Sequence, residues 1–205
     1  MPDTDVSAFN TSEGTVAASA ARFVTAARPN TSATMANTTT GSTGGRNVTV
    51  TTSGTGDNEK TCTITGTDMY GTAQTEVITS TGSAEAVAGT KIFKTVTAVE
   101  CSAQYAANIT VGTGTLYAVA VGGQTSAKRM RLKSHSIVSG GTAGNIDYID
   151  GAPGTGTTRI VARAIGTADT TSDYYIPDDG VLFENGIVVK STVDVADFLQ
   201  VYYTG

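Results

Sequence analysis

Residues 175–189 read YIPDDGVLFENGIVV, and this stretch decides the fold class. The proline-to-glycine segment at 177–180 predicts a turn, because proline fixes φ and glycine permits backbone angles that other residues avoid. The Asn-Gly pair at 185–186 is a strong signal for a tight hairpin between two strands. A further strand, FLQVYYTG, follows at 198–205. Short strands joined by tight turns are typical of the closing part of a β-sandwich.

The composition agrees with a β protein. Threonine is the commonest of the 205 residues, glycine occurs 24 times, tryptophan is absent, and only 15% of the residues are charged. Abundant threonine and valine suit half-buried strands, and a low charge content argues against intrinsic disorder. The net charge of −5 disfavours non-specific binding to nucleic acid.

No apolar run approaches the roughly 20 residues that a membrane-spanning helix needs, so no membrane partner is expected. The first five residues, MPDTD, lack the basic and apolar regions of a signal peptide. We therefore expect the chain to be made and folded in a cytoplasm.

The chain divides into three parts by composition. Residues 1–45 predict an extended N-terminal arm, because the stretch at 30–45 is polar and almost without charge. Apolar residues at helical spacing between 16 and 27 leave one short helix as an alternative. Short strand signals then recur between glycine-rich turns, with a seam near residue 114. We predict antiparallel β-sandwich or jelly-roll-like modules in tandem at 46–114 and 115–205, one larger sandwich being the alternative.

Each predicted module has about 70 to 90 residues and can bury only a modest core. Association with a partner or with further copies of the chain would stabilise such modules. We therefore expect a homo-oligomer or docking on another protein.

Cys62 and Cys101 are the only cysteines. Two cysteines in a chain of this length do not form a disulfide framework, so two buried thiols are the first interpretation and a bridge between strands is the second. No cluster of cysteine and histidine completes a tetrahedral metal site. We expect no metal and no cofactor.

A basic stripe precedes the single histidine. Strand alternation predicts that Arg129, Arg131, Lys133 and His135 share one face, with Met130 and other apolar residues on the opposite face. The simplest interpretation is a solvated outer face. A second is a docking surface for an acidic neighbour, and nucleic acid ranks third because no aromatic residues interleave with the charges.

Two stretches resemble small virion proteins of tailed bacteriophages. The first runs from Ile-Pro at 176–177 through Phe-Glu-Asn-Gly at 183–186 to the closing Val-Tyr-Tyr at 201–203. The second is the TITGTDMYGTAQTEVI segment at 63–78, followed by GTKIFKTVT at 89–97. The resemblance covers a little over half of the chain beyond residue 45, and it rests on scaffold segments rather than on functional-site motifs.

The resemblance implies a non-enzymatic virion structural protein, assembled in the host cytoplasm. Within the virion, we predict a head decoration or cement protein that binds the major capsid protein or other virion subunits. A trimer would suit the three-fold axes of a capsid, by analogy alone. A neck, tail or fibre component is the alternative, and a bacterial surface adhesin module is the third.

The sequence contains no recognisable catalytic motif: one histidine is present, and there is no nucleophile elbow and no phosphate-binding loop. The residues expected to contact a partner are Phe23 and Val24, as anchors of the arm, and Arg129, Arg131 and Lys133, as a basic docking stripe.

Overall fold

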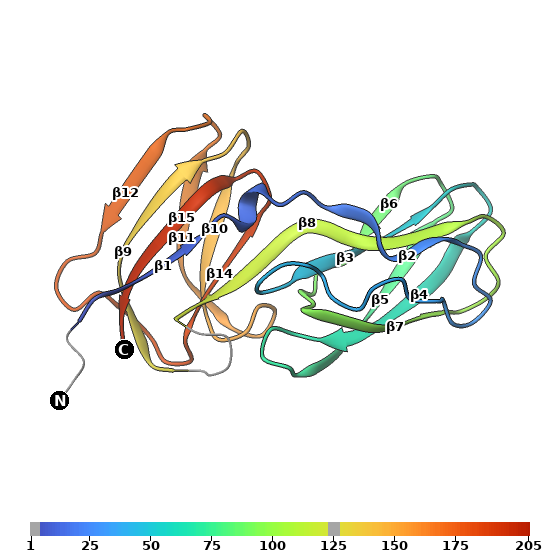
Figure 1. The fold of residues 1–205 in the computed structure, drawn as a ribbon, viewed down its shortest axis with the longest axis horizontal. Helices are drawn as coiled ribbons and strands as arrows, with labels where there is room; N and C mark the ends of the chain where they lie inside the picture. Colours follow the sequence, from blue (N-terminus) through green and yellow to red (C-terminus); the bar gives the residue numbers. More distant parts are fainter. Residues whose placement is uncertain (1–4, 123–127) are drawn as a thin grey trace. The chain divides into compact units, whose positions relative to one another are not determined.

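A computed structural model describes residues 5–122 and 128–205 of the chain. The prediction of an all-β, antiparallel fold is confirmed, and the one helical element in the described ranges is the short 3-10 turn η1, Glu13–Thr15. The chain forms two compact units (Figure 1). Unit 1 comprises residues 1–17 and 116–205, and unit 2 comprises residues 18–115.

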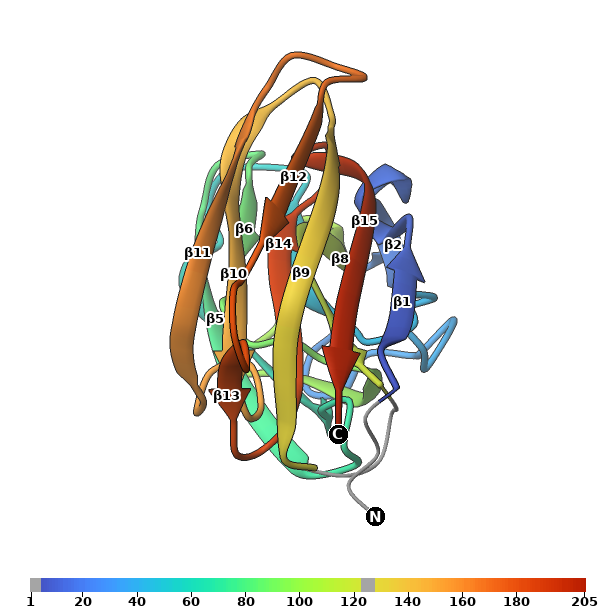
Figure 2. The same ribbon diagram turned by 90° about the vertical axis from the view of Figure 1, so that its left-hand side faces the viewer.

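Unit 1 is a sandwich of two sheets. One sheet has the order β1-β15-β9-β12, with β13 also paired to β9, and the other has the order β11-β10-β14-β8. Figure 2 shows β12 and β13 following one another along the same edge of β9. Strand β8 spans Ile109–Val121, and its second part, from Leu116, belongs to unit 1. The other strands are β1 Ser7–Thr11, β9 Met130–Ser139, β10 Ala143–Asp150, β11 Thr157–Ile165, β12 Thr171–Tyr175, β13 Val181–Phe183, β14 Ile187–Thr192 and β15 Ala196–Thr204.

The core of unit 1 lies between these two sheets. Strand alternation sends Leu199 and Val201 of β15 inward, where they meet Ile146 and Tyr148 of β10 and Val189 of β14. The N-terminal strand β1 completes the sheet by pairing with β15, the last strand of the chain.

Unit 2 has a second, separate core. The sheet β5-β4-β7 faces β3, which is flanked by β6 and the first part of β8, while β2 pairs with the other side of β8. The strands are β2 Ser19–Ala27, β3 Arg46–Thr52, β4 Asn58–Thr67, β5 Ala73–Thr81, β6 Ala86–Ala88 and β7 Thr95–Cys101.

The N-terminal segment does not form a separate arm. It is divided between the two units after residue 17. Phe23 and Val24 lie on β2 and have no exposed surface, because both pack into the core of unit 2. The short helix is absent from this segment, and residues 28–45 follow β7 through isolated bridges such as Ser32 with Glu100. The prediction that Phe23 and Val24 anchor an arm on a neighbouring surface is therefore wrong.

The predicted Asn-Gly hairpin is also different in the structure. Gly186 has a φ of 85°, but Asn185 stays outside the left-handed region that a type I′ turn requires. The turn joins β13, which pairs with β9, to β14, which pairs with β10 and β8. It therefore carries the chain from one sheet of the sandwich to the other.

Candidate functional site

The basic stripe lies beside two turns, the one that precedes β13 and the one that joins β13 to β14. Each of its three side chains makes one contact within unit 1. The contacts are Arg129 Nε with Glu184 Oε2 at 3.5 Å, Arg131 Nη1 donating to the Asp179 carbonyl at 3.4 Å, and Lys133 Nζ donating to the Asp178 carbonyl at 3.1 Å. Two of these acceptors are neutral carbonyls, so the positive charges of Arg131 and Lys133 remain available to a partner.

His135 does not share the face of the basic stripe. In β9, Ser134 pairs with Tyr202 and Leu132 pairs with Tyr203, so Lys133 has no partner in β15 and forms a bulge. The bulge reverses the alternation beyond it, and His135 turns inward with only 4% of its surface exposed. The prediction that His135 lies with the three basic residues is therefore wrong.

Beyond the bulge, β9 contributes to a face that we call the outer face. Its eleven side chains come from four strands, point away from the core, and are exposed or half-buried. They form the cross-strand rows Ala8–Tyr202–Ser134–Tyr175, Asn10–Gln200–Ser136–Asp173 and Phe198–Val138–Thr171.

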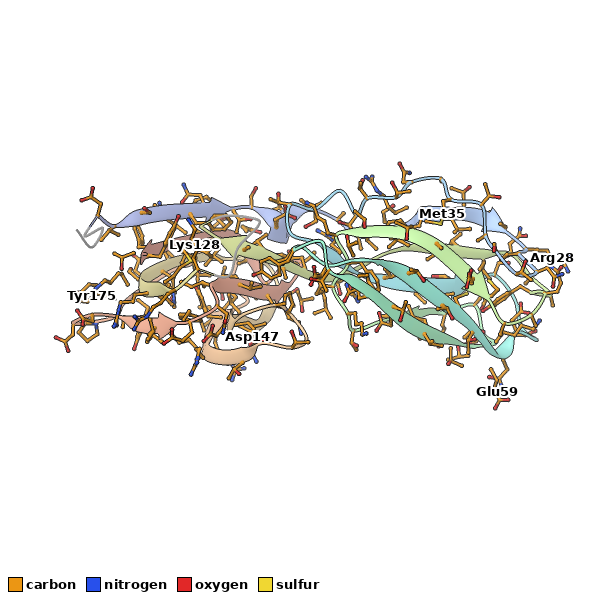
Figure 3. All side chains as sticks on the ribbon, turned by 90° about the horizontal axis from the view of Figure 1, so that it is seen from below. Arg28, Met35, Glu59, Lys128, Asp147 and Tyr175 are labelled. Carbon is orange, nitrogen blue, oxygen red and sulfur yellow. The ribbon has the colours of Figure 1, made fainter. Side chains whose placement is uncertain are left out.

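The outer face carries little charge. Asp173 is the single charged member, whereas a soluble surface with about 25–35% charged residues would place about three on eleven positions. Aromatic side chains stand at its corners: Tyr175 is 71% exposed and Phe198 is 37% exposed. Figure 3 labels Tyr175 at the end of β12. An aromatic and nearly uncharged sheet face is suited to contact with another protein surface.

A buried carboxylate, that of Asp150, stabilises the turn between β13 and β14. Asp150 Oδ2 accepts hydrogen bonds from Arg159 Nη2 at 2.8 Å and from the Glu184 amide at 3.2 Å, and its Oδ1 accepts from the Asn185 amide at 2.7 Å. Burial opposes ionisation of Asp150, but these donors outweigh it and hold the pKa of the carboxyl below its usual value.

Unit 2 contains a similar carboxylate. Asp57 is fully buried, forms an ion pair with Lys60 at 2.7 Å, and accepts hydrogen bonds from the amides of Ala106 at 2.7 Å and Ala107 at 3.0 Å. Burial again acts against the charged form, and the donors again lower the pKa. Both carboxylates connect loops distant in sequence, and their hydrogen bonds to protein donors identify them as structural groups.

The two cysteines face each other across β4 and β7. Cys62 pairs directly with Cys101, and the sulfur atoms lie 3.7 Å apart as free thiols. The hydrogen bond to Cys62, together with burial, raises the pKa of Cys101, so this thiol stays protonated. The Tyr105 hydroxyl lies 3.3 Å from the sulfur of Cys62.

The described ranges contain no group of three or more His, Cys, Asp or Glu side chains placed to hold a metal ion. They also contain no helix with the length and apolar character required to cross a membrane. Comparisons of the chain with protein families, with curated proteins and with solved structures give no match. The functional assignment therefore depends on the sequence resemblance and on the surfaces of the two units.

Proposed function

We propose that the chain is a non-enzymatic structural protein of a tailed-bacteriophage virion, and specifically a head decoration or cement protein that binds the outer surface of the capsid. Two observations support the proposal. The first is the resemblance of the segments at 63–97 and 176–203 to phage virion proteins. The second, which carries the docking role, is the outer face of unit 1 with its single charge.

The basic stripe extends this docking surface. Arg131 and Lys133 lie on β9 before the bulge reverses the alternation of side chains. Both point to the same side of the sheet as Ser134. Lys133 and Ser134 are neighbours at the bulge, so the basic residues border the row that ends in Tyr175. An uncharged aromatic area with a basic border fits a partner surface that is apolar at its centre and acidic at its edge.

The size of the outer face indicates how it would be used. A standard protein interface contributes about 20–30 residues from each side, so eleven residues form a small one. Small interfaces gain strength when many copies are held together, because each further contact becomes intramolecular. A capsid lattice or a homo-oligomer of this chain provides that arrangement, and the major capsid protein is the proposed partner.

A binding experiment on phage heads tests the proposal. Heads stripped of this protein are incubated with the purified chain, and bound protein is measured after sedimentation. The variant Gln200→Lys places an unpaired charge at the centre of the outer face, where an interface would bury it. The control Thr79→Lys adds the same charge at an exposed position of β5 in unit 2.

We expect the wild-type chain and Thr79→Lys to bind heads alike, and Gln200→Lys to bind about tenfold more weakly or worse, because burying an unpaired charge is costly. Equal binding by Gln200→Lys would exclude the outer face as the docking surface. No binding by the wild-type chain would contradict the decoration role itself.

A further inference from the structure

Unit 1 contains an open cavity of about 450 Å³ on the side of the sheet opposite the outer face. It lies between β11 of one sheet and β9, β12 and β13 of the other. Both β11 and β12 are the last strands of their sheets, so the cavity opens where the sandwich ends. Its volume is within the range of about 300–1,000 Å³ that is typical of small-molecule sites.

The walls of the cavity are mainly apolar. Ile137 of β9 and Ile160 of β11 face each other across it, and Ile176 and Val181 line the side formed by the segment after β12. Branched aliphatic side chains of this kind accommodate an aromatic ring or a short alkyl group, because such a group removes its own apolar surface and theirs from water.

His135 supplies a polar group inside this apolar cavity. Its ring stacks with Tyr148 at a centroid distance of 5.3 Å and with Tyr174 at 5.6 Å, so its orientation is fixed. Its Nδ1 atom is buried and has no hydrogen-bond partner in the part of the chain that the structure describes. A buried and unsatisfied polar atom at a cavity wall is uncommon in folded proteins and points to a functional site.

Arg163 is the one charged residue that lines the cavity. Its side chain makes no hydrogen bond and no ion pair within the described ranges, whereas Arg159 on the same strand is bound to Asp150 and Arg129 is paired with Glu184. It alternates with the inward-facing Ile160 and Ala162 along the edge strand β11, so its guanidinium is available at the rim of the cavity and not inside it. A guanidinium in this position favours a planar anion such as a carboxylate.

We propose that the cavity binds a small amphipathic anion, in which an aromatic or branched alkyl group lies among the isoleucines and a carboxylate contacts Arg163. The inference is independent of the proposed virion role. On β9 and β12 the residues that line the cavity, His135 and Tyr174 among them, alternate with those of the outer face. A ligand in the cavity therefore leaves the outer face free.

The single histidine makes the test direct, because the chain contains one imidazole and its NMR signals need no assignment. The intact protein, labelled with ¹⁵N, is titrated with 4-phenylbutyrate and separately with the uncharged 4-phenylbutanol. We expect 4-phenylbutyrate to shift the His135 ring signals saturably, with a Kd below about 10 mM. The alcohol should bind about threefold more weakly, as the loss of one half-exposed charge pair implies.

Three variants show where the probe binds. Ala162→Leu extends a lining side chain into the cavity and should abolish the shifts. Arg163→Gln should weaken 4-phenylbutyrate about threefold without affecting the alcohol. The control Arg129→Gln changes an exposed arginine of the same unit outside the cavity and should leave both titrations unchanged.

The proposal is overturned if neither probe shifts the imidazole signals saturably, or if Ala162→Leu, shown by circular dichroism to be folded, binds like the wild-type chain. Equal affinities for the acid and the alcohol would overturn the anionic part. Failure of these titrations would leave binding to phage heads unaffected, so the two proposals are tested separately.

Discussion

Asp150 offers the sharpest test of how unit 1 is held together. Replacing it with alanine removes the acceptor of two backbone amides and the partner of Arg159. Hydrogen bonds to a charged group contribute about 1.5–3 kcal/mol each, which gives about 3 kcal/mol for the two amides at the lower limit. Arg159 is 44% exposed, so its share is at most about 1 kcal/mol.

Burying the charge of Asp150 is unfavourable, and the alanine variant no longer has to do so. This gain offsets part of the loss. We expect Asp150→Ala to destabilise unit 1 by about 3 kcal/mol, or to lower its Tm by about 10 °C. The control Asp173→Ala removes an exposed aspartate of the same unit and should change the stability by less than about 0.5 kcal/mol. Urea denaturation followed by circular dichroism measures both variants.

Hydrogen exchange gives a local measurement of the same contacts. The amides of Glu184 and Asn185 should exchange much faster in Asp150→Ala, because they lose their acceptors. If Asp150→Ala is as stable as Asp173→Ala and both amides remain protected, the carboxylate does not anchor this turn, and its five hydrogen-bond donors do not stabilise unit 1.

The pH dependence follows from the same group. The folded-state pKa of Asp150 lies below its ordinary value of 3.8, so below about pH 4 the unfolded chain binds more protons than the folded chain. The stabilisation is present above the ordinary pKa and is lost as the pH falls through the folded pKa. The pKa of Asp57 is lowered in the same way. The free energy of unfolding of the wild-type chain should therefore fall steeply below about pH 4. The same fall should be less steep in Asp150→Ala, which lacks one of the two carboxylates.

The remaining predictions concern the core, the cysteines and the histidine. Phe23→Ala should destabilise unit 2 by about 3–5 kcal/mol in urea denaturation, whereas the exposed Val77→Ala should cost little; equal effects would contradict the placement of β2. Diamide should convert Cys62 and Cys101 into an intramolecular disulfide, since directly paired strand residues lie within disulfide reach; mass spectrometry that finds two thiols after treatment would oppose this. Burial should give His135 an NMR pKa below 6.5, although Asp173 acts in the opposite direction; a value above 6.5 would contradict its burial.

The fold class was predictable because it depends on local signals. Threonine-rich strands between glycine turns predict antiparallel sheets, and the closing strand predicted at 198–205 corresponds to β15, Ala196–Thr204. The pairing of β1 with β15 could not be predicted, because the two strands are separated by almost the whole chain. The assignment of the first 17 residues to unit 1 depends on that pairing.

The errors at the candidate sites have a common physical cause, which is irregular pairing. Strand β2 shifts register around Val24, so Phe23 and Val24 both turn inward although they are consecutive. With this irregularity, the apolar residues between 16 and 27 fall at a spacing that resembles that of a helix. The bulge at Lys133 likewise reverses the direction of His135. Sequence periodicity assumes regular strands, and it fails where one residue is added to one side of a ladder.

The buried carboxylates lay beyond sequence reasoning for a different reason. The amides that bind Asp57 come from residues 49 and 50 positions later in the chain. An aspartate in a glycine-rich turn gives no indication that its partner is a distant loop. The outer face was equally hidden, because its rows combine four strands whose order only the fold determines.

The copy number of the protein in purified virions tests the central proposal most directly. Quantitative gel densitometry, calibrated against the major capsid protein, should give hundreds of copies for each particle, as a protein repeated over the head surface requires. A dozen or so copies would contradict the decoration role and favour a neck or tail component. Absence of the chain from the particle would contradict a virion role altogether.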